Sequence, residues 1–150
     1  MSLKEKINED LKNAMKSGDK IRLETIRSIR ALILEFEKSG IGKELNTEEE
    51  IKMLSTAAKK RKDSIEQFRN GGREELAKKE ESELKILQEY LPKQLSDEEI
   101  QSEIRIIAES LGAKTKDDFP KLMPQVMKSM KGKADGKIVK AAVEKYLGIN

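Results

Sequence analysis

The 150-residue chain contains no cysteine and no histidine. Without cysteine it cannot form a disulfide, a thiolate nucleophile or a cysteine-ligated metal site. Without histidine it lacks the usual general base at neutral pH and the commonest metal ligand, and its serines have no imidazole to activate them. We therefore expect no catalytic residue, no metal site and no bound cofactor.

Long apolar runs are also missing. Charged residues begin at Lys4 and Glu5, with no apolar signal-peptide core behind them. The longest apolar run, residues 31–34, is far shorter than the roughly 20 residues of a membrane span. We therefore expect no membrane association and a cytoplasmic location.

Proline and aromatic residues are scarce, with three prolines and 3% aromatic residues. No alternating β-branched segment is long enough to indicate a sheet. Charged residues make up 39% of the chain, against a usual ~25%, and apolar residues recur at helical spacing. The sequence predicts an all-α protein: an amino-terminal antiparallel helical bundle followed by a small carboxyl-terminal helical module.

The amino-terminal half carries start and stop signals for the first two helices. Ser2 can cap the first helix, and Ser17-Gly18-Asp19 separates it from the second, with Asp19 as the next cap. Glycines in residues 40–46 indicate a linker rather than a phosphate-binding loop, because the pattern of such a loop is absent. The side chains expected to be buried on the first helix are Leu3, Ile7, Leu11 and Met15.

Two longer helices are expected to complete the bundle over residues 1–92. Thr47 and Glu50 predict a capping box for a third helix, which ends at Gly71 in a left-handed conformation. The fourth helix, roughly 73–90, is expected to bury Leu76, Ala77, Leu84, Leu87 and Leu91. Pro92 then stops the helix.

The carboxyl-terminal module is expected over residues 96–150. Ser96 and Glu99 form a capping box, and the helix that follows ends at Gly112. Pro124 indicates that the next helix starts irregularly or begins only at that proline. Asp135 can cap the last helix. The apolar side chains expected on these last two helices are Phe119, Met123, Val126, Met127, Met130, Val139, Ala142, Val143, Tyr146 and Leu147.

Several short motifs carry a resemblance to a known family. They are SIEQF at 64–68, GGR at 71–73, EYLPKQLS at 89–96 and KGKADGKIVKAAVEKYL at 131–147, with LKNAMKSGDKIRLETIRSIRALI near the amino terminus. In this order they resemble the YqeY family, relatives of the B subunit of the tRNA-dependent amidotransferases. The resemblance extends to the helical and tail regions of that subunit, which contact tRNA, and not to its catalytic domain. It therefore implies a noncatalytic tRNA-associated protein, and makes a carbon–nitrogen ligase that uses glutamine the least favoured function.

Clustered acidic residues do not change this interpretation. Those at 48–50 and 97–99 fall in the first turns of expected helices, where the helix dipole favours negative charge. Glu80, Glu83 and Lys79 lie close together on the fourth helix, and we expect ordinary surface pairing there.

The basic residues suggest an RNA-binding surface. Seven lysines and two acidic residues between positions 121 and 145 give a local charge of +5. Lysine charge and the amino end of a helix both attract phosphate, and Gly132 and Gly136 would let a backbone approach. The scarcity of aromatic residues favours the backbone of a folded RNA such as tRNA over unpaired bases. The candidate RNA-binding residues are Lys128, Lys131, Lys133, Lys137 and Lys140.

Two alternatives stay open. The lysines can form an ordinary solvated helix face, as a second basic segment at 59–73 also can. The chain can instead be a helical adaptor that docks onto a translation enzyme through residues 94–120. That segment has seven acidic and three basic residues, a charge of −4.

Overall fold

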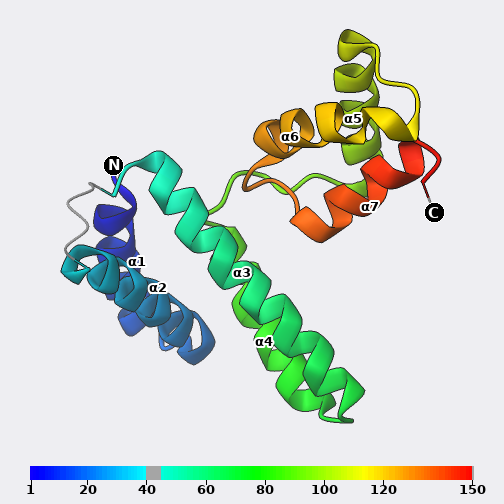
Figure 1. The fold of residues 1–150 in the computed structure, drawn as a ribbon. Helices are drawn as coiled ribbons and strands as arrows, with labels where there is room; N and C mark the ends of the chain where they lie inside the picture. The colour runs from blue at the N-terminus through cyan, green and yellow to red at the C-terminus, as the bar shows by residue number, and fades with distance from the viewer. Residues whose placement is uncertain (40–44, 150) are drawn as a thin grey trace. The chain divides into compact units, whose positions relative to one another are not determined.

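The computed structural model describes residues 1–39 and 45–149. These residues form helices and connections with no strand (Figure 1), so the all-α prediction is confirmed. The elements are α1 (Leu3–Ser17), α2 (Lys20–Lys38), α3 (Thr47–Asn70), α4 (Glu74–Gln88), α5 (Asp97–Leu111), a short 3₁₀ helix η1 (Lys116–Asp118), α6 (Phe119–Met130) and α7 (Gly136–Tyr146). Every described helix is too short or too polar to serve as a membrane span. The linker expected at 40–46 lies mostly outside the described residues.

Tertiary contacts divide the chain into two compact units, Met1–Pro92 and Lys93–Asn150. In the first unit α3 and α4 form a long antiparallel hairpin, and α1 and α2 form a second pair (Figure 1). The α2 helix also packs against α4. The buried core of this unit consists of Leu3, Ile7, Ala14, Ile26, Ile29, Ile33, Leu54, Ala58 and Leu87.

The helix starts mostly follow the capping signals. Ser2 and Asp19 cap α1 and α2 as predicted. The capping box predicted at Thr47 is wrong, because Asn46 is the cap and its Oδ1 accepts from the backbone N–H of Glu49 at 2.8 Å. Asn46 has extended backbone geometry, from which its short side chain reaches the third residue of the helix. Thr47 is already helical.

The turn between α3 and α4 also differs from the prediction by one residue. Gly71 has a φ of −86°, whereas Gly72 has a φ of +73° and takes the left-handed conformation. Two backbone hydrogen bonds close the end of α3: Gly72 N–H to Arg69 O at 3.1 Å and Arg73 N–H to Phe68 O at 2.7 Å. This pair of bonds is the Schellman motif, which places the left-handed residue at Gly72.

Met15 was expected in the core but is exposed. Residues four apart in sequence are not directly above one another on a helix, and this angular offset accumulates along it. At 3.6 residues per turn, Met15 lies about 120° from Leu3, whereas Ala14 lies only about 20° from it. Ala14 is accordingly buried and Met15 is 58% exposed. Leu76, Met127 and Tyr146, which were also expected to be buried, are exposed as well. Buried side chains that the pattern missed include Ile86 and Leu122.

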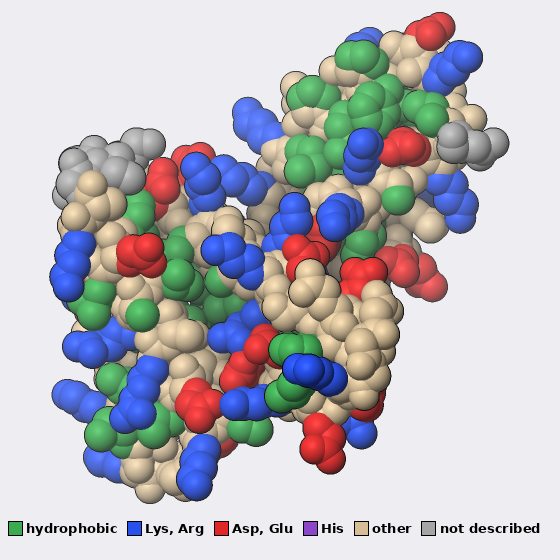
Figure 2. Space-filling model, turned by 60° about the horizontal axis from the view of Figure 1, so that its bottom comes forward, with side chains coloured by type: hydrophobic (Ala, Val, Ile, Leu, Met, Phe, Trp, Pro, Cys, Tyr) green, Lys and Arg blue, Asp and Glu red, His purple; other side chains and the backbone are tan. Residues whose placement is uncertain are grey.

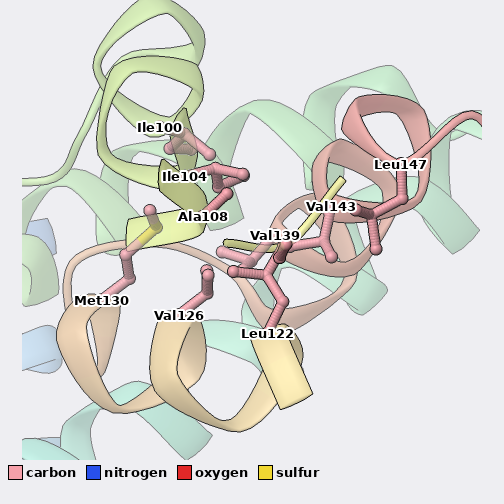
Figure 3. Close-up of a cluster of buried hydrophobic side chains, with 10 residues drawn as sticks. Ile100, Ile104, Ala108, Leu122, Val126, Met130, Val139, Val143 and Leu147 are labelled. Atoms are coloured by element: carbon pink, nitrogen blue, oxygen red, sulfur yellow. The ribbon is translucent and has the colours of Figure 1, made fainter. Parts of the chain in front are cut away.

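The second unit packs α5, α6 and α7 around its own core (Figure 3). Ser96 and Glu99 form the predicted capping box, Gly112 ends α5 with a φ of +69°, and Asp135 caps α7. The α6 helix begins at Phe119 and contains Pro124, so a start at Pro124 is wrong. The 3₁₀ helix directly precedes α6. The core side chains are Ile100, Ile104, Ala108, Ala113, Leu122, Val126, Met130, Val139, Val143 and Leu147.

Candidate nucleic-acid interface

The five candidate lysines lie around the turn between α6 and α7. One is in the last turn of α6, two are in the turn itself, and two are on α7, three residues apart and therefore on neighbouring positions of the helix surface. All five side chains are exposed: Lys128, Lys131, Lys133, Lys137 and Lys140. We call this group the lysine corner.

The backbone of this turn is held by the segment that opens the second unit. Gln94 Nε2 donates to Gly132 O at 2.8 Å, and Leu95 N–H donates to Lys133 O at 2.8 Å. Gly132 takes a φ of +77° at this point, which glycine adopts without a side-chain clash. Sequence reasoning missed both hydrogen bonds, although Gln94 and Leu95 belong to the EYLPKQLS motif. They give the lysine corner a defined backbone.

The amino end of α7 is already occupied by a carboxylate. Asp135 Oδ1 accepts from the backbone N–H of Lys137 at 2.9 Å. Gly136, at the first position of α7, lies next to a side chain of α6. A Cβ at this position would stand 3.4 Å from Cε of Met127, which packs against it. The backbone N–H of Lys137 at this helix end is therefore already bonded to a carboxylate.

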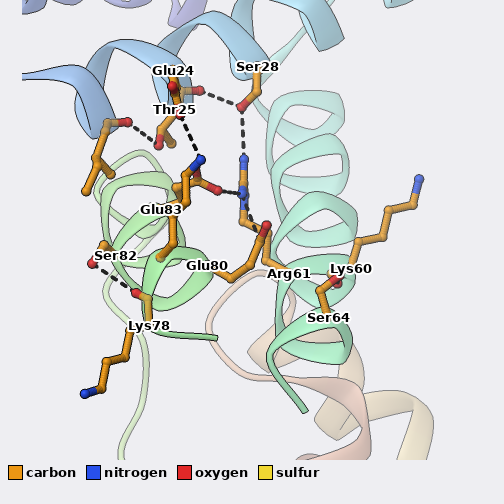
Figure 4. A network of polar contacts seen from close by, with 12 residues as sticks. Glu24, Thr25, Ser28, Lys60, Arg61, Ser64, Lys78, Glu80, Ser82 and Glu83 are labelled. Atoms are coloured by element: carbon orange, nitrogen blue, oxygen red, sulfur yellow. Dashed lines mark hydrogen bonds and ion pairs between the residues drawn. The ribbon is translucent and has the colours of Figure 1, made fainter. Parts of the chain in front are cut away.

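The second basic segment, residues 59–73, is partly neutralised by ion pairs. Arg69 on α3 pairs with Glu74 at 3.2 Å and with Glu81. Arg61, also on α3, pairs with Glu80 at 3.1 Å and with Glu83 (Figure 4). Two of its arginines are thus committed to carboxylates of α4.

The surface pairing expected for Glu80, Glu83 and Lys79 is wrong. Lys79 Nζ instead lies 3.5 Å from Oε2 of Glu24 on α2. Glu83 is only 7% exposed, because it lies on the face of α4 that packs against the bundle. A buried carboxylate needs a partner, and Arg61 supplies it from the neighbouring helix.

The Arg61 network continues into α2. Arg61 Nη2 donates to Ser28 Oγ at 3.2 Å, and Ser28 Oγ donates to Thr25 O at 2.6 Å (Figure 4). Thr25 is fully buried, and its hydroxyl donates to Ile21 O at 2.8 Å. Every polar group named here has a partner within the bundle, so the network fixes α2, α3 and α4 together.

A groove of about 630 Å³ in the first unit is also lined by paired side chains. Arg22 donates to both carboxylate oxygens of Glu89, at 2.7 and 3.3 Å. The Tyr90 hydroxyl donates to Asp10, and Lys6 Nζ lies 5.3 Å from the centre of the Tyr90 ring. Burial, together with the hydrogen bond to Asp10, raises the pKa of the Tyr90 phenol well above its usual range. Tyr90 therefore stays neutral and offers no base.

The acidic clusters behave as helix-start residues. Those at 48–50 and 97–99 lie in the first turns of α3 and α5, as predicted. Within residues 1–39 and 45–149, no three carboxylates are grouped so that they could hold a metal ion.

Comparison with known proteins gives consistent matches. A family model described as "Yqey-like protein" matches residues 4–147. The protein named "Altered inheritance of mitochondria protein 41, mitochondrial" from Pyrenophora tritici-repentis is 34% identical over 95% of this chain and 80% of its own length. The proteins of that name from Lachancea thermotolerans and Kluyveromyces lactis are 38% and 36% identical over 57% and 56% of this chain.

The aligned region spans just under half of the Lachancea and Kluyveromyces proteins, 46% and 45% of their lengths. These relatives are named as mitochondrial proteins. They therefore do not confirm the cytoplasmic location expected from the sequence.

Proposed function

This chain belongs to the YqeY-like family, and on that premise we propose that it is a noncatalytic accessory protein that binds a folded RNA such as tRNA. The observation that carries the proposal is the lysine corner: five exposed lysines around one turn. Its backbone is held by the hydrogen bonds from Gln94 and Leu95.

The chemistry of the corner suits phosphate rather than bases. An ammonium group is a point charge on a flexible stem, so it neutralises a phosphate without requiring a fixed orientation. Each phosphate that it neutralises releases condensed counterions, which makes binding weaken as salt rises. The corner offers charge and no aromatic side chain, so it recognises the backbone and shape of a folded RNA.

The lysine corner is favoured over the other basic segment because its five exposed lysines gather around one turn whose backbone is held by hydrogen bonds. In residues 59–73 the guanidinium groups of Arg61 and Arg69 are held by four carboxylates. A phosphate would have to compete with these carboxylates.

The test is the salt dependence of tRNA binding, measured by fluorescence anisotropy with labelled tRNA. The variant Lys131→Gln, Lys133→Gln, Lys137→Gln removes three charges and keeps much of the side-chain length. Each lost phosphate contact lowers the slope of log affinity against log salt by roughly 0.7–0.9. We expect weaker binding and a slope flattened by about two units.

A charge-matched control separates a local effect from a net-charge effect. Lys12, Lys16 and Lys20 are exposed lysines of the first unit, and their replacement by glutamine removes the same charge. We expect this control to bind almost as tightly as the unaltered chain. Equal losses in both variants, or no tRNA binding at low salt, would contradict the proposal. The second result would favour the adaptor function through residues 94–120.

A further inference from the structure

A surface groove of about 500 Å³ lies between α5 and α7, outside the lysine corner. The α5 helix lines it with Gln101, Ser102 and Arg105, all exposed, above the buried Ile104. The α7 helix lines it with Lys145 and Tyr146. Figure 2 shows that the surface of this unit includes grouped hydrophobic side chains among charged ones. The groove thus combines an aromatic ring, two cations, two polar side chains and the carboxylate of Glu98.

Tyr146 is exposed without an evident structural role. The buried face of α7 is formed by Val139 and Val143, and the buried Leu147 directly follows the helix. Tyr146, the last residue of α7, remains 39% exposed. Its hydroxyl makes no hydrogen bond to any residue that the structure describes. The other tyrosine, Tyr90, is half-buried and bonded to Asp10. A large aromatic side chain that is left in a groove offers a free π face to a ligand.

The two cations of the groove are likewise uncommitted. Arg105 and Lys145 form no ion pair within the described part of the chain, whereas Arg22, Arg61 and Arg69 are all held by carboxylates. An unpaired guanidinium beside an ammonium group is suited to an anion such as a phosphate.

We infer that the groove binds one unpaired nucleotide of the folded RNA, a step that rests on the proposed function. The base stacks on the Tyr146 ring, and its phosphate lies near Arg105 and Lys145. Gln101 and Ser102 offer hydrogen bonds to the base edge, and the carboxylate of Glu98, at the same groove, can accept from an amino group of the base.

The groove lies toward the carboxyl end of α7, and the lysine corner lies at its amino end. Lys137 is nine residues before Tyr146, which is about 13 Å along the helix axis and about half a turn around it. An RNA molecule that contacts both must therefore pass around α7. A protein helix fits less well, because a helix-binding groove needs a row of apolar pockets. Most of the side chains that line this groove are instead polar or charged: Glu98, Gln101, Ser102, Arg105 and Lys145.

The test compares labelled tRNA with a short, unstructured oligo-uridine RNA. Tyr146→Leu removes the aromatic face and keeps an apolar side chain, whereas Tyr146→Phe keeps the ring. Stacking on an aromatic ring is worth enough to change affinity about ten-fold. We expect Tyr146→Leu to weaken both RNAs by about that factor with an unchanged salt slope, and Tyr146→Phe to bind normally.

Two further variants locate the effect. Arg105→Gln with Lys145→Gln is expected to flatten the salt slope for oligo-uridine by roughly 1.4 units, at about 0.7 for each phosphate contact on a single strand. Ile106→Ala changes an exposed apolar side chain of α5 that does not line the groove, and it is expected to bind both RNAs normally. Circular dichroism of each variant verifies that the fold is kept.

The possible results separate this inference from the proposed function. If tRNA binds and Tyr146→Leu has no effect, the groove is not a nucleotide site, and the lysine corner is judged on its own test. If oligo-uridine binding depends on Tyr146 while the lysine variant behaves normally, the groove is supported and the corner is not. Absence of binding to either RNA at low salt would overturn both and leave the groove to a protein partner.

Discussion

Arg61 on α3 links three helices of the first unit. It donates a hydrogen bond to Ser28 on α2 and forms ion pairs with Glu80 and Glu83 on α4. Its own side chain is 18% exposed and that of Glu83 is 9% exposed. Removing one partner of a buried ion pair leaves the other charge without compensation, which is more costly than the pair is stabilising. The network therefore makes the packing of α2, α3 and α4 depend on one residue.

We predict that Arg61→Met lowers the free energy of unfolding by about 3 kcal/mol, measured by urea denaturation. Arg69→Met is the matched control, since Arg69 is on the same helix and pairs with two carboxylates at the surface. Surface ion pairs contribute little, so this variant should unfold almost as the unaltered chain does. A similar loss in both variants would show that the burial of Glu83 is unimportant.

The same position offers a rescue. Combining Arg61→Met with Glu83→Met removes the uncompensated buried carboxylate and replaces the pair by apolar side chains. Such replacements are often neutral or stabilising. The double variant should therefore recover most of the stability that Arg61→Met loses.

At the scale of single elements, the capping box at the start of α5 includes a titratable carboxylate, that of Glu99. Ser96 Oγ accepts from the N–H of Glu99 at 3.2 Å, and the Ser96 N–H donates to the Glu99 carboxylate at 3.1 Å. The backbone N–H of Ser96, then its hydroxyl, holds the pKa of Glu99 below its usual range. Hydrogen bonds from the N–H groups of Lys114 and Thr115 lower the pKa of Asp118 in the same unit.

Because of these lowered pKa values, the unfolding free energy of the second unit depends on pH in the acidic range. The unfolded chain binds protons near the ordinary glutamate pKa of about 4.3, while the folded chain resists protonation to lower pH. The stabilisation is therefore complete above that pH and is lost as pH falls through the folded pKa. We predict that Glu99→Gln makes the unfolding free energy fall less steeply below about pH 4. Glu109→Gln serves as the control, and identical pH curves for the two variants would contradict the prediction.

The elements themselves were predictable because their signals are local. Ser96, Gly112 and Asp135 act through bonds within a few residues, and each was identified correctly from the sequence. The errors arose where the deciding contact is distant in sequence, or where a small angular offset decides which side chain is buried. Glu83 looked like a surface residue because its partner Arg61 is 22 positions away. Met15 was predicted to be buried because apolar residues four apart were assumed to share one face. The angular offset that accumulates over several such steps was neglected.

The candidate site was only partly predictable for the same reason. The candidate lysines could be identified from the sequence alone, because the local net charge follows directly from which residues are present. The bonds that hold their turn join residues 38 positions apart, and no local pattern indicates them. The α5–α7 groove was missed because Tyr146 was assigned to the buried stripe.

At the scale of the whole molecule, each unit has a core built from its own residues. Pro92 and Lys93 form the boundary, and Lys93 is exposed. We predict that fragments 1–92 and 93–150 each fold when produced alone, and that their circular dichroism spectra add up to that of the whole chain. The shorter fragment buries a smaller share of its surface and should melt at a lower temperature.

Limited trypsin digestion provides the complementary measurement. Cleavage after Lys93 should release two resistant fragments, because helical cores protect the other lysines and arginines better than an exposed connection does. Unfolding of either fragment in isolation, seen as loss of helical signal, would show that the units need each other.

The hydrogen bonds that hold the lysine turn have a consequence for how this surface can change. Gln94 and Leu95 bind the carbonyl oxygens of Gly132 and Lys133, which every residue type carries. These two hydrogen bonds therefore do not depend on which side chains project from the turn at 131 and 133. Mutation can add or remove positive charge there while the backbone stays in place. Affinity for a partner can thus evolve, or be engineered, separately from folding.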